Sequence, residues 1–321
     1  MGDGVKILDW REAISQCPQG QASLDLLSNE PSAEKVQRML RFGHPFSEYV
    51  GLYAEDQGQL LARVNVERRQ WTHNKRVQTV SAISDVLSRP DTLRKGLMTA
   101  LFKELHSREK EAGVLLSFLW TQRSWGAHSF YEDLGYRDVF SHPWATARIK
   151  GVPPRFPQGY GSRICRKKDL NLLGTLLRQG THGRLGFVPR FRRSFEERIA
   201  LGFWTVGDYR ILTYQGSAVG YAYAAVDKDR LHVIEGVVSS REHLPALLDL
   251  IETVAAGKWI YVESTTFVND ATPLLRDRGY LVVPKSHSVL MVKTLKGGRD
   301  PRAIQDVCQS PLFSCHAGDK F

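Results

Sequence analysis

The expected order of strands and helices is the same on both sides of a short segment rich in proline and glycine. This segment, residues 150–159, holds three prolines and two glycines, which neither a helix nor a central strand tolerates. On each side, the spacing of apolar residues predicts helical structure, a hairpin, a strand, a helix, a strand, a helix and a last strand. A chain whose halves repeat one order of elements is expected to fold as two similar domains that arose by duplication.

The order of elements fits an α+β fold, with two tandem domains that are each a mixed, twisted β-sheet flanked by helices. In the first half we expect helices over 31–42, 98–112 and 127–134, and strands over 49–54, 60–67, 79–87, 114–121 and 144–149. In the second half we expect helices over 170–179, 193–201, 244–255 and 270–278, and strands over 210–214, 218–226, 232–238, 259–264 and 289–293. We place the domains at 1–150 and 160–296, with a linker over 151–159 and a polar tail over 297–321.

Length and hydropathy set the broad class. A chain of 321 residues is long for one core and sufficient for two domains of about 150 residues each. No run of about 18 or more apolar residues occurs, so no membrane span is expected. The first residues, Met-Gly-Asp-Gly-Val-Lys, lack the apolar core of a secretory signal. We therefore expect a cytoplasmic protein without a membrane partner.

The chain is basic, with a formal net charge of +10. A basic surface attracts nucleic acid, acidic substrates or a nucleotide that carries several phosphates. Part of the excess lies in 163–168 and 184–198, without the regular aromatic residues of single-strand binders. A solvated basic face explains these runs equally well, so nucleic acid is not expected as a partner. The segment 180–198 could select an acidic acceptor, or be a loop followed by a charged helix face.

The four cysteines do not form a metal or disulfide pattern. They lie at 17, 165, 308 and 315, without a CxxC pair. Cys308 and Cys315 precede His316, but this spacing matches no zinc site or disulfide framework. We expect no metal.

Residues 84–101 are expected to carry a strand through a basic turn into a helix. The turn contains Pro90, Arg94, Lys95 and Gly96, and the helix begins near Leu97. The first amides of a helix lack partners, and its dipole favours an anion. The turn is therefore a candidate phosphate site, with Arg94 and Lys95 as phosphate-facing cations. An ordinary strand-to-helix turn would also account for this segment alone.

Residues 124–136 are expected to form a short helix that presents a tyrosine. Ala127, Phe130 and Leu134 share one helix face, and Gly135 suits the C-cap. Tyr131 lies beside this face. It could be an amphipathic residue packed at the helix end, or it could provide a hydroxyl for chemistry.

Together the two motifs resemble the acyl-CoA site of the GNAT superfamily of N-acetyltransferases, of the tandem-domain type. The family's loop, Arg/Gln-x-x-Gly-x-Gly/Ala, aligns on Gly96, with Leu93 in place of the leading Arg or Gln and Met98 in place of the last small residue. The family's later pattern, Asn-x-x-Ala-x-x-Phe-Tyr-x-x-x-Gly-Phe, is followed closely, with Ser124 in place of the Asn and Tyr136 in place of the last Phe.

The resemblance implies that acetyl-CoA is a co-substrate and that a primary amine attacks it directly in a ternary complex. It implies that a backbone N–H near Val86 or Leu87 polarises the thioester carbonyl, and that Tyr131 is the general acid for the departing thiolate. The implied cofactor-binding residues are Val86, Leu87, Leu93, Arg94, Lys95, Gly96, Leu97, Met98 and Ser124. The base could be Asp85, Glu67 or His73, among which no spacing argument decides; Asp85 is the assigned candidate.

The second half resembles the same fold without a cofactor site. The segment 239–244 has no glycine-rich loop, and Arg241 is its only arginine. Leu275 stands at the position of Tyr131, whereas Asn269, Gly279 and Tyr280 keep the outline of the last helix. In tandem proteins of this family, a silent half of this kind helps to shape the acceptor groove.

Two other functions stay open. A tRNA-dependent aminoacyltransferase of the same tandem fold would suit the basic charge, although the loop from Pro90 to Gly96 argues against it. A non-catalytic CoA-binding or scaffold protein would suit the substitutions at Leu93 and Met98. The acceptor is expected to be a small-molecule or peptide amine, and aminoglycosides, polyamines, peptide N-termini and amino sugars all fit.

Overall fold

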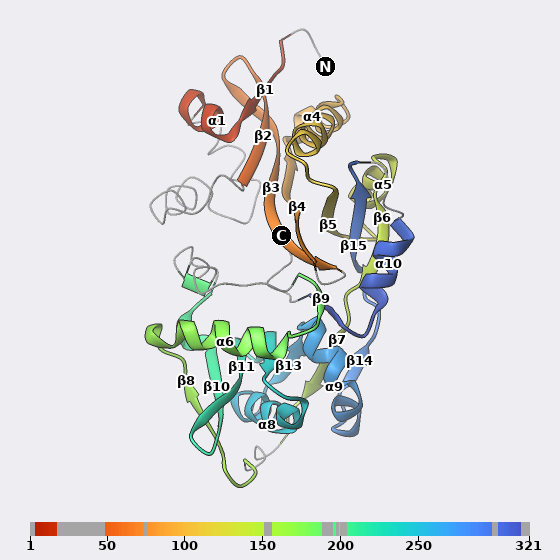
Figure 1. The fold of residues 1–321 in the computed structure, drawn as a ribbon. Helices are drawn as coiled ribbons and strands as arrows, with labels where there is room; N and C mark the ends of the chain where they lie inside the picture. The colour runs from red at the N-terminus through yellow and green to blue at the C-terminus, as the bar shows by residue number, and fades with distance from the viewer. Residues whose placement is uncertain are drawn as a thin grey trace.

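The chain folds into two twisted β-sheets with helices packed on both (Figure 1). The computed structural model describes residues 4–17, 49–73, 76–150, 156–187, 195–196, 199, 204–296 and 301–315. Both sheets mix parallel and antiparallel strands, so the predicted α+β fold with two mixed sheets flanked by helices is confirmed. The expected helix over 31–42 lies outside the described residues, as does most of the one over 193–201.

The first sheet is built mainly from the N-terminal half. Across the sheet, its strands run in the order β1 (Lys6–Asp9), β2 (Tyr49–Asp56), β3 (Gln59–His73), β4 (Arg76–Ser88), β5 (Leu116–Gln122), β15 (Ser288–Thr294) and β6 (Arg137–Ser141). The short β9 (Leu185–Gly186) joins β3 to β16 (Phe313–Ser314). The helices of this half are α1 (Trp10–Gln16), α4 (Leu97–Glu111) and α5 (Gly126–Asp133).

The core on one face of the first sheet holds α4 and α5 in place. Leu97 and Phe102 of α4 and Tyr131 of α5 are buried in one cluster with Val64 of β3 and Met291 of β15. The apolar residues of α4 recur at helical spacing, so a single stripe faces the sheet. The cluster fixes the start of α4 and the middle of α5 relative to β4, which precedes both helices in sequence.

The second sheet repeats this plan in the C-terminal half. Its strands run in the order β14 (Leu281–Val283), β7 (Trp144–Arg148), β13 (Trp259–Val262), β12 (Arg230–Val238), β11 (Ser217–Asp227), β10 (Tyr209–Tyr214) and β8 (Tyr160–Ile164). Its helices are α6 (Leu170–Gly180), α8 (Leu244–Val254) and α9 (Thr265–Asp277). One core contains α8 and α9, and a separate one contains α6.

The two predicted hairpins are confirmed, and their turns are alike. Gln57 and Gly58 join β2 to β3, and Gln215 and Gly216 join β10 to β11. All four residues have positive φ, between 48° and 80°. Two consecutive residues of positive φ are typical of the tight turn whose twist matches that of antiparallel strands.

One strand of each half lies in the sheet of the other half. β15 comes from the C-terminal half but pairs between β5 and β6 of the first sheet. β7 comes from the N-terminal half but pairs between β13 and β14 of the second sheet. The prediction that 144–149 closes the first sheet and that 289–293 ends the second is therefore wrong. Apolar alternation shows that a segment is a strand, but it carries no information about which sheet accepts that strand.

Residues 301–315, part of the segment that we expected to be a polar tail, are folded. Residues 301–309 form α10 (Pro301–Gln309), and Ile304 and Cys308 of this helix are buried against Trp71 and Phe118 of the first sheet. Positions 304, 307 and 308 are apolar and lie on one face of the helix. The polar residues around them make this stripe difficult to recognise in the sequence. The division into domains at 151–159 stays a prediction, because the exchanged strands tie both halves together.

All four cysteines are buried and unbonded to one another. In the described part of the chain, no cluster of three or more His, Cys, Asp or Glu side chains could hold a metal ion. His316 lies outside that part.

None of the helices in the described segments is long and apolar enough to cross a membrane.

Candidate functional site

The parallel strands β4 and β5 separate halfway along the first sheet. They pair from Ser81 and Ser117 to Ile83 and Leu119, and the described pairing ends there although both strands continue. The peptide groups of 84–87 that would face β5 are therefore left without a strand partner in this pairing. Such groups are available to a ligand, because unpaired backbone N–H and C=O groups seek hydrogen bonds.

A β-bulge lies at the point of separation. Ser84 pairs with Asn65 and Leu87 pairs with Arg63, so Asp85 and Val86 together oppose the single residue between those two. Asp85 has a φ of 51°, which is uncommon for a residue with a side chain. Bulges redirect the backbone and are frequent beside active sites. This one lies beside Val86 and Leu87, whose amides the sequence motif singled out.

The Asp85 carboxylate holds the bulge to the neighbouring strand. Its Oδ2 forms an ion pair with Arg63 Nη2 at 2.6 Å and accepts a hydrogen bond from Asn65 Nδ2 at 2.9 Å. The Arg63 side chain is only 1% exposed, so it requires a counter-charge, and Asp85 provides one. These contacts favour a positioning role for Oδ2, and they leave Oδ1 as the oxygen that could accept a proton.

The two other base candidates are placed differently. Glu67 is bound to Arg69 at 2.6 Å, two residues from Asn65 on β3. His73 lies at the end of β3, eight residues beyond Asn65, which is roughly 26 Å away at about 3.3 Å per residue. The structure therefore separates His73 from the bulge and keeps Asp85 at it.

We expect Asp85→Asn to lower the free energy of unfolding by about 3 kcal/mol, because it removes the carboxylate that forms an ion pair with the buried Arg63 guanidinium. Urea denaturation at neutral pH measures this change. The matched control is Asp91→Asn, since Asp91 forms an exposed ion pair with Arg89, and such pairs contribute about 1 kcal/mol or less. An Asp85→Asn protein of unchanged stability would contradict the positioning role.

The predicted phosphate loop follows β4 and is anchored at its base. Thr92 is buried at the end of the short turn Pro90–Thr92. Its hydroxyl donates a hydrogen bond to Arg89 O at 2.9 Å. Arg94 has a φ of 62° and Gly96 a φ of 76°, and a Cβ on Gly96 would meet nothing within 4 Å. The loop thus presents an open surface of backbone at the start of α4.

The N-terminus of α4 is uncapped and electropositive. Gly96 is its N-cap residue, and no side chain in the described part of the chain caps the first amides. Arg94 and Lys95 are exposed beside it. The one carboxylate of the loop, Asp91, accepts two hydrogen bonds from Arg89, and this contact lowers the pKa of Asp91. The net result is a helix end suited to an anion.

The two residues of the loop that depart from the family pattern, Leu93 and Met98, do not cover the start of α4. Leu93 is 60% exposed, so its side chain points to solvent and away from the core. Met98 is half-buried and packs against the core that holds α4 and α5. Leu97 is buried in that core, so only its backbone could meet a ligand.

Tyr131 lies at the centre of an aromatic cluster. It is 6% exposed, and its ring centroid is 5.8 Å from that of Phe102 on α4 and 6.1 Å from that of Tyr136. Burial raises the pKa of Tyr131 to about 12, and no described residue forms a hydrogen bond with its hydroxyl. The phenol is therefore protonated at neutral pH and able to donate. Val86 and Met98 pack against the same core, so the bulge and the start of α4 border the core that contains Tyr131.

Two buried contacts that the sequence did not reveal hold the residues that follow Tyr131 in place. The Tyr136 hydroxyl lies 2.9 Å from His106 Nε2 and 2.7 Å from Ser117 Oγ. Burial, followed by the charge of Lys293, lowers the pKa of His106 to about 3, so the imidazole that contacts Tyr136 is neutral. Lys293, on the exchanged strand β15, donates to Leu134 O at 2.5 Å. A distant strand thus holds the end of α5, which no local pattern could indicate.

Ser124 is exposed in the turn between β5 and α5. The N-cap of α5 is the next residue, Trp125, which is 56% exposed, and no side chain caps the helix. Ser124 is outside the core cluster around Tyr131, so its predicted contact with the cofactor stays a prediction.

The second sheet has the same separation without the same residues. β12 pairs with β13 only as far as Val233 and Val262, and its register with β11 shifts at the next position. At the end of α9, the Tyr280 N–H donates to Leu275 O at 2.9 Å, just as the Tyr136 N–H donates to Tyr131 O at 3.0 Å. Leu275 therefore occupies the position of Tyr131 and offers no proton.

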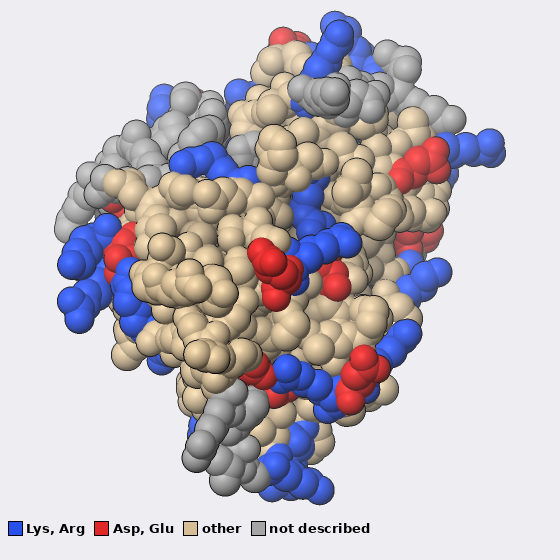
Figure 2. Space-filling view, turned by 60° about the horizontal axis from the view of Figure 1, so that its bottom comes forward, with Lys and Arg blue, Asp and Glu red and all other residues tan. Residues whose placement is uncertain are grey.

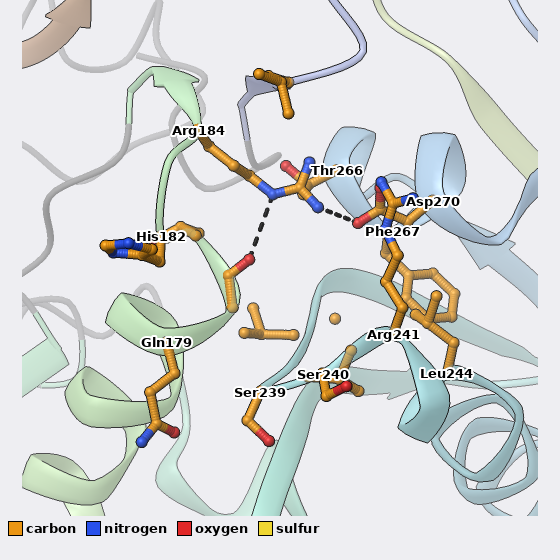
Figure 3. A pocket seen from close by; sticks show the side chains of 16 residues that line it. Gln179, His182, Arg184, Ser239, Ser240, Arg241, Leu244, Thr266, Phe267 and Asp270 are labelled. Carbon is orange, nitrogen blue, oxygen red and sulfur yellow. Dashed lines mark hydrogen bonds and ion pairs between the residues drawn. The ribbon is translucent and has the colours of Figure 1, made fainter. Parts of the chain in front are cut away.

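A cavity of about 230 Å³ lies where the strands of the second sheet separate (Figure 3). Arg184, which begins the basic run of 184–198, lines this cavity and forms an ion pair with Asp270 of α9. Its side chain is 9% exposed, so Arg184 is neither at the first-sheet site nor on an exposed helix face. Residues 188–194 of the run lie outside the described part.

Charge on the lower face of the molecule is mixed (Figure 2). Lys and Arg side chains lie around the edges of this face and in a group near its middle, where they stand beside Asp or Glu. Among the described residues visible there, the basic side chains do not form a continuous stripe of the kind that follows a nucleic-acid backbone.

Comparison with known proteins agrees with this fold. Residues 28–139 match the family described as Acetyltransferase (GNAT) domain. A probable N-acyltransferase from Enterococcus faecalis is 16% identical, with a TM-score of 0.68 over 91% of this chain and 72% of that one. A tandem GNAT protein from the clavulanic acid biosynthesis pathway is 12% identical, with a TM-score of 0.56 over 92% and 100%. The N-myristoyltransferase of Saccharomyces cerevisiae, solved with bound myristoyl-CoA, is 8% identical, with a TM-score of 0.57 over 91% and 79%.

The comparison with curated proteins returns no match. The fold is nevertheless that of a tandem GNAT protein, as the sequence predicted. Within the chain, the match to the acetyltransferase (GNAT) domain covers residues 28–139.

Proposed function

We propose that the protein is an N-acetyltransferase that moves an acetyl group from acetyl-CoA to a primary amine of a small-molecule or peptide acceptor. The observation that carries the proposal is a combination in the matched domain. The separation of β4 from β5, with its bulge at Asp85, adjoins the uncapped, basic N-terminus of α4. The first feature offers an amide to a carbonyl, and the second offers donors to a pyrophosphate.

The reaction is a direct transfer in a ternary complex. The neutral amine attacks the thioester carbonyl, and the oxygen that gains negative charge accepts a hydrogen bond from the amide of Val86 or Leu87. The C–S bond then breaks, the sulfur leaves as a thiolate and the nitrogen loses a proton. Asp85 Oδ1 is the proposed acceptor of that proton, because Oδ2 is held by Arg63 and Asn65.

Tyr131 stabilises the leaving thiolate. Its phenol, with a pKa of about 12, is a weaker acid than a thiol, whose ordinary pKa is about 8.5. The phenol therefore donates a hydrogen bond to the sulfur as its charge develops. A donor of this kind, aimed at developing charge in a buried site, accelerates the step without having to release its own proton completely.

The loop geometry supports CoA binding over a purely structural role. The side chains of Leu93 and Met98, which depart from the family pattern, point to solvent or pack against the core and leave the first amides of α4 open. We propose that these amides, with Arg94 and Lys95, hold the pyrophosphate of acetyl-CoA. The N-myristoyltransferase, with its bound myristoyl-CoA, shares the fold.

Calorimetric titration with acetyl-CoA tests the proposal. We expect the wild-type protein to bind with a micromolar Kd and an Arg94→Glu/Lys95→Glu protein to bind at least about tenfold more weakly, because each charge-assisted hydrogen bond to phosphate is strong.

The matched control is Lys103→Glu/Lys110→Glu, which makes the same charge change at exposed positions further along α4. If this control weakens binding as much as the loop variant, the effect comes from net charge and the loop is not the site. The absence of any wild-type binding would contradict the proposed function itself.

A further inference from the structure

The cavity of the second sheet lies among polar groups from three separate elements. Gly180 and Thr181 come from the end of α6, Ser239 from the end of β12, and Thr266 from the first turn of α9. Figure 3 shows the labelled side chains of these elements standing around one hollow. The leading residues of α9 and the end of β12 face the same space, so the cavity occupies the gap that opens where β12 leaves β13.

The charged groups of the cavity are one carboxylate and two guanidiniums. Asp270 Oδ2 accepts a hydrogen bond from Arg184 Nη2, and Asp270 Oδ1 accepts one from Arg241 Nη2 at 3.1 Å. Arg184 also donates from Nε to Gly180 O at 3.3 Å. The Asp270 side chain is only 10% exposed, so both of its oxygens are used within the protein. These three groups together carry a net positive charge.

One donor of the site has no hydrogen-bond partner among the described residues. Arg184 is nine-tenths buried, and its Nη1 is buried without a hydrogen-bond partner. A buried guanidinium nitrogen without a partner costs free energy, because a charged donor has lost its water. Arg241, in contrast, is 71% exposed and is held on one side only. Its guanidinium can therefore turn to a ligand at little cost, since an exposed ion pair is weak.

We propose that this cavity binds a small anion, a carboxylate or phosphate group on a compact molecule, between Arg241 and Arg184. The anion accepts hydrogen bonds from the exposed guanidinium of Arg241 and competes with Asp270 for it. It also draws the unpartnered Nη1 of Arg184 into a hydrogen bond as the two side chains readjust. Guanidinium groups suit both chemistries, because their paired N–H donors match the oxygens of a carboxylate and of a phosphate.

The size and chemistry of the cavity argue against a second molecule of CoA. A volume of about 230 Å³ is below the roughly 300–1,000 Å³ of pockets that hold drug-sized ligands. The buried Arg184–Asp270 pair stands in the gap where β12 and β13 separate, and Leu275 replaces the tyrosine of the first sheet. The second sheet thus keeps the gap between its separating strands, and this gap suits an anion smaller than CoA.

The position of Arg184 links this site to the first sheet. The next two residues, Leu185 and Gly186, form β9, and Gly186 pairs with Thr72 of β3. Gly186 is packed tightly, since a Cβ there would lie 2.6 Å from the Phe313 ring and 2.7 Å from Ser314 O. An anion that moves Arg184 therefore acts on a segment whose next residues are tightly packed. This arrangement places the proposed site where it can influence the strand that carries Arg63 and Asn65.

The proposal is tested with inorganic phosphate and citrate as probes, in calorimetric titrations at constant ionic strength. We expect Arg241→Gln to weaken binding of the preferred probe at least about tenfold, because it removes a charge-assisted donor. We expect Asp270→Asn to strengthen binding several-fold, because it removes the competing carboxylate. The size of the two effects separates a specific site from a general effect of charge, which would change binding only slightly and equally for any lost charge of the same sign.

The matched control is Arg230→Gln, an exposed arginine of the same half at the start of β12, which does not line the cavity. Its affinity for the probes should equal that of the wild type. Binding that Arg230→Gln and Arg241→Gln weaken equally would overturn the proposal, as would the absence of binding by either probe. If Asp270→Asn fails to fold, the pair Arg241→Gln and Arg241→Lys still decides, since lysine keeps the charge but loses the paired donors and should bind with intermediate affinity.

Discussion

Replacement of Tyr131 with Phe should lower kcat by about 100-fold or more, the usual contribution of a positioned proton donor, and should leave the Kd for acetyl-CoA nearly unchanged. The phenol stabilises charge that appears on sulfur only as the C–S bond breaks, so its loss affects the transition state and not the bound cofactor. Because phenylalanine keeps the ring that packs against Phe102 and Tyr136, the fold should be preserved. Release of free CoA with an amine acceptor measures turnover, and calorimetry measures binding.

Tyr136→Phe is the matched control, because it makes the same change one residue beyond the glycine that ends α5. The Tyr136 hydroxyl is spent on His106 and Ser117 inside the protein, so its loss should reduce stability by about 1–3 kcal/mol and change kcat little. Equal losses of kcat in the two variants would show that the aromatic cluster matters only as packing. An unchanged kcat in Tyr131→Phe would remove Tyr131 from the mechanism.

The pH dependence gives an independent check on the role of Tyr131. Its raised pKa of about 12 keeps the donor protonated throughout the usual assay range, so any alkaline limb of the rate profile belongs to other groups and should persist in Tyr131→Phe. The same shift affects stability with a definite sign. An unfolded tyrosine ionises near pH 10, so the contribution of Tyr131 to stability is complete below pH 10 and is lost as the pH rises toward 12.

The local parts of the candidate site could be predicted from sequence because each depends on a few neighbouring residues. Gly96 marks the start of α4, and Gly135, with a φ of 91°, marks the end of α5. These features follow from backbone conformation, which glycine permits and other residues resist. Arg94 and Lys95 could likewise be assigned to the loop, because position relative to a helix N-terminus is a property of the sequence.

The contacts that support the site could not be predicted, because they join residues far apart in the chain. Arg63 and Asp85 meet across two strands, and Lys293 reaches Leu134 from the other half of the molecule. A pattern of apolar and polar residues gives the face that a residue occupies, but not the partner that it meets there. In the sequence alone, a buried arginine cannot be distinguished from an exposed one, because the residue that provides its counter-charge is not known.

The exchange of β7 and β15 shows the same limit at the level of the fold. Both segments alternate apolar residues as strands should, and the sequence locates each of them correctly. In β15, Val289 and Met291 pack on the side of α4 and α5, whereas Leu290 and Val292 pack on the side of α10. A strand with both faces buried suits the centre of a sheet. The sequence does not show which of the two sheets contains it.

The exchanged strands predict that neither half of the chain folds alone. We expect a fragment of residues 1–155 to lack a cooperative unfolding transition. Without β15, the edges of β5 and β6 are left unpaired, and the cluster around Trp71 loses α10 and Phe313. Exposed central strands and a missing core wall lead to aggregation. Circular dichroism during heating and size-exclusion chromatography measure the loss of fold.

The complementary experiment is to produce residues 1–155 together with 156–321, which should associate and melt as the intact chain does, because β7 and β15 can each pair with the other fragment. The control is the full chain with a protease site inserted at 151–155 and cleaved after folding, whose melting temperature should change little. A fragment 1–155 that is soluble and unfolds cooperatively by itself would contradict this prediction. It would show that β5 and β6 can close the first sheet without β15, and that the two halves are joined by association and not by mutual completion.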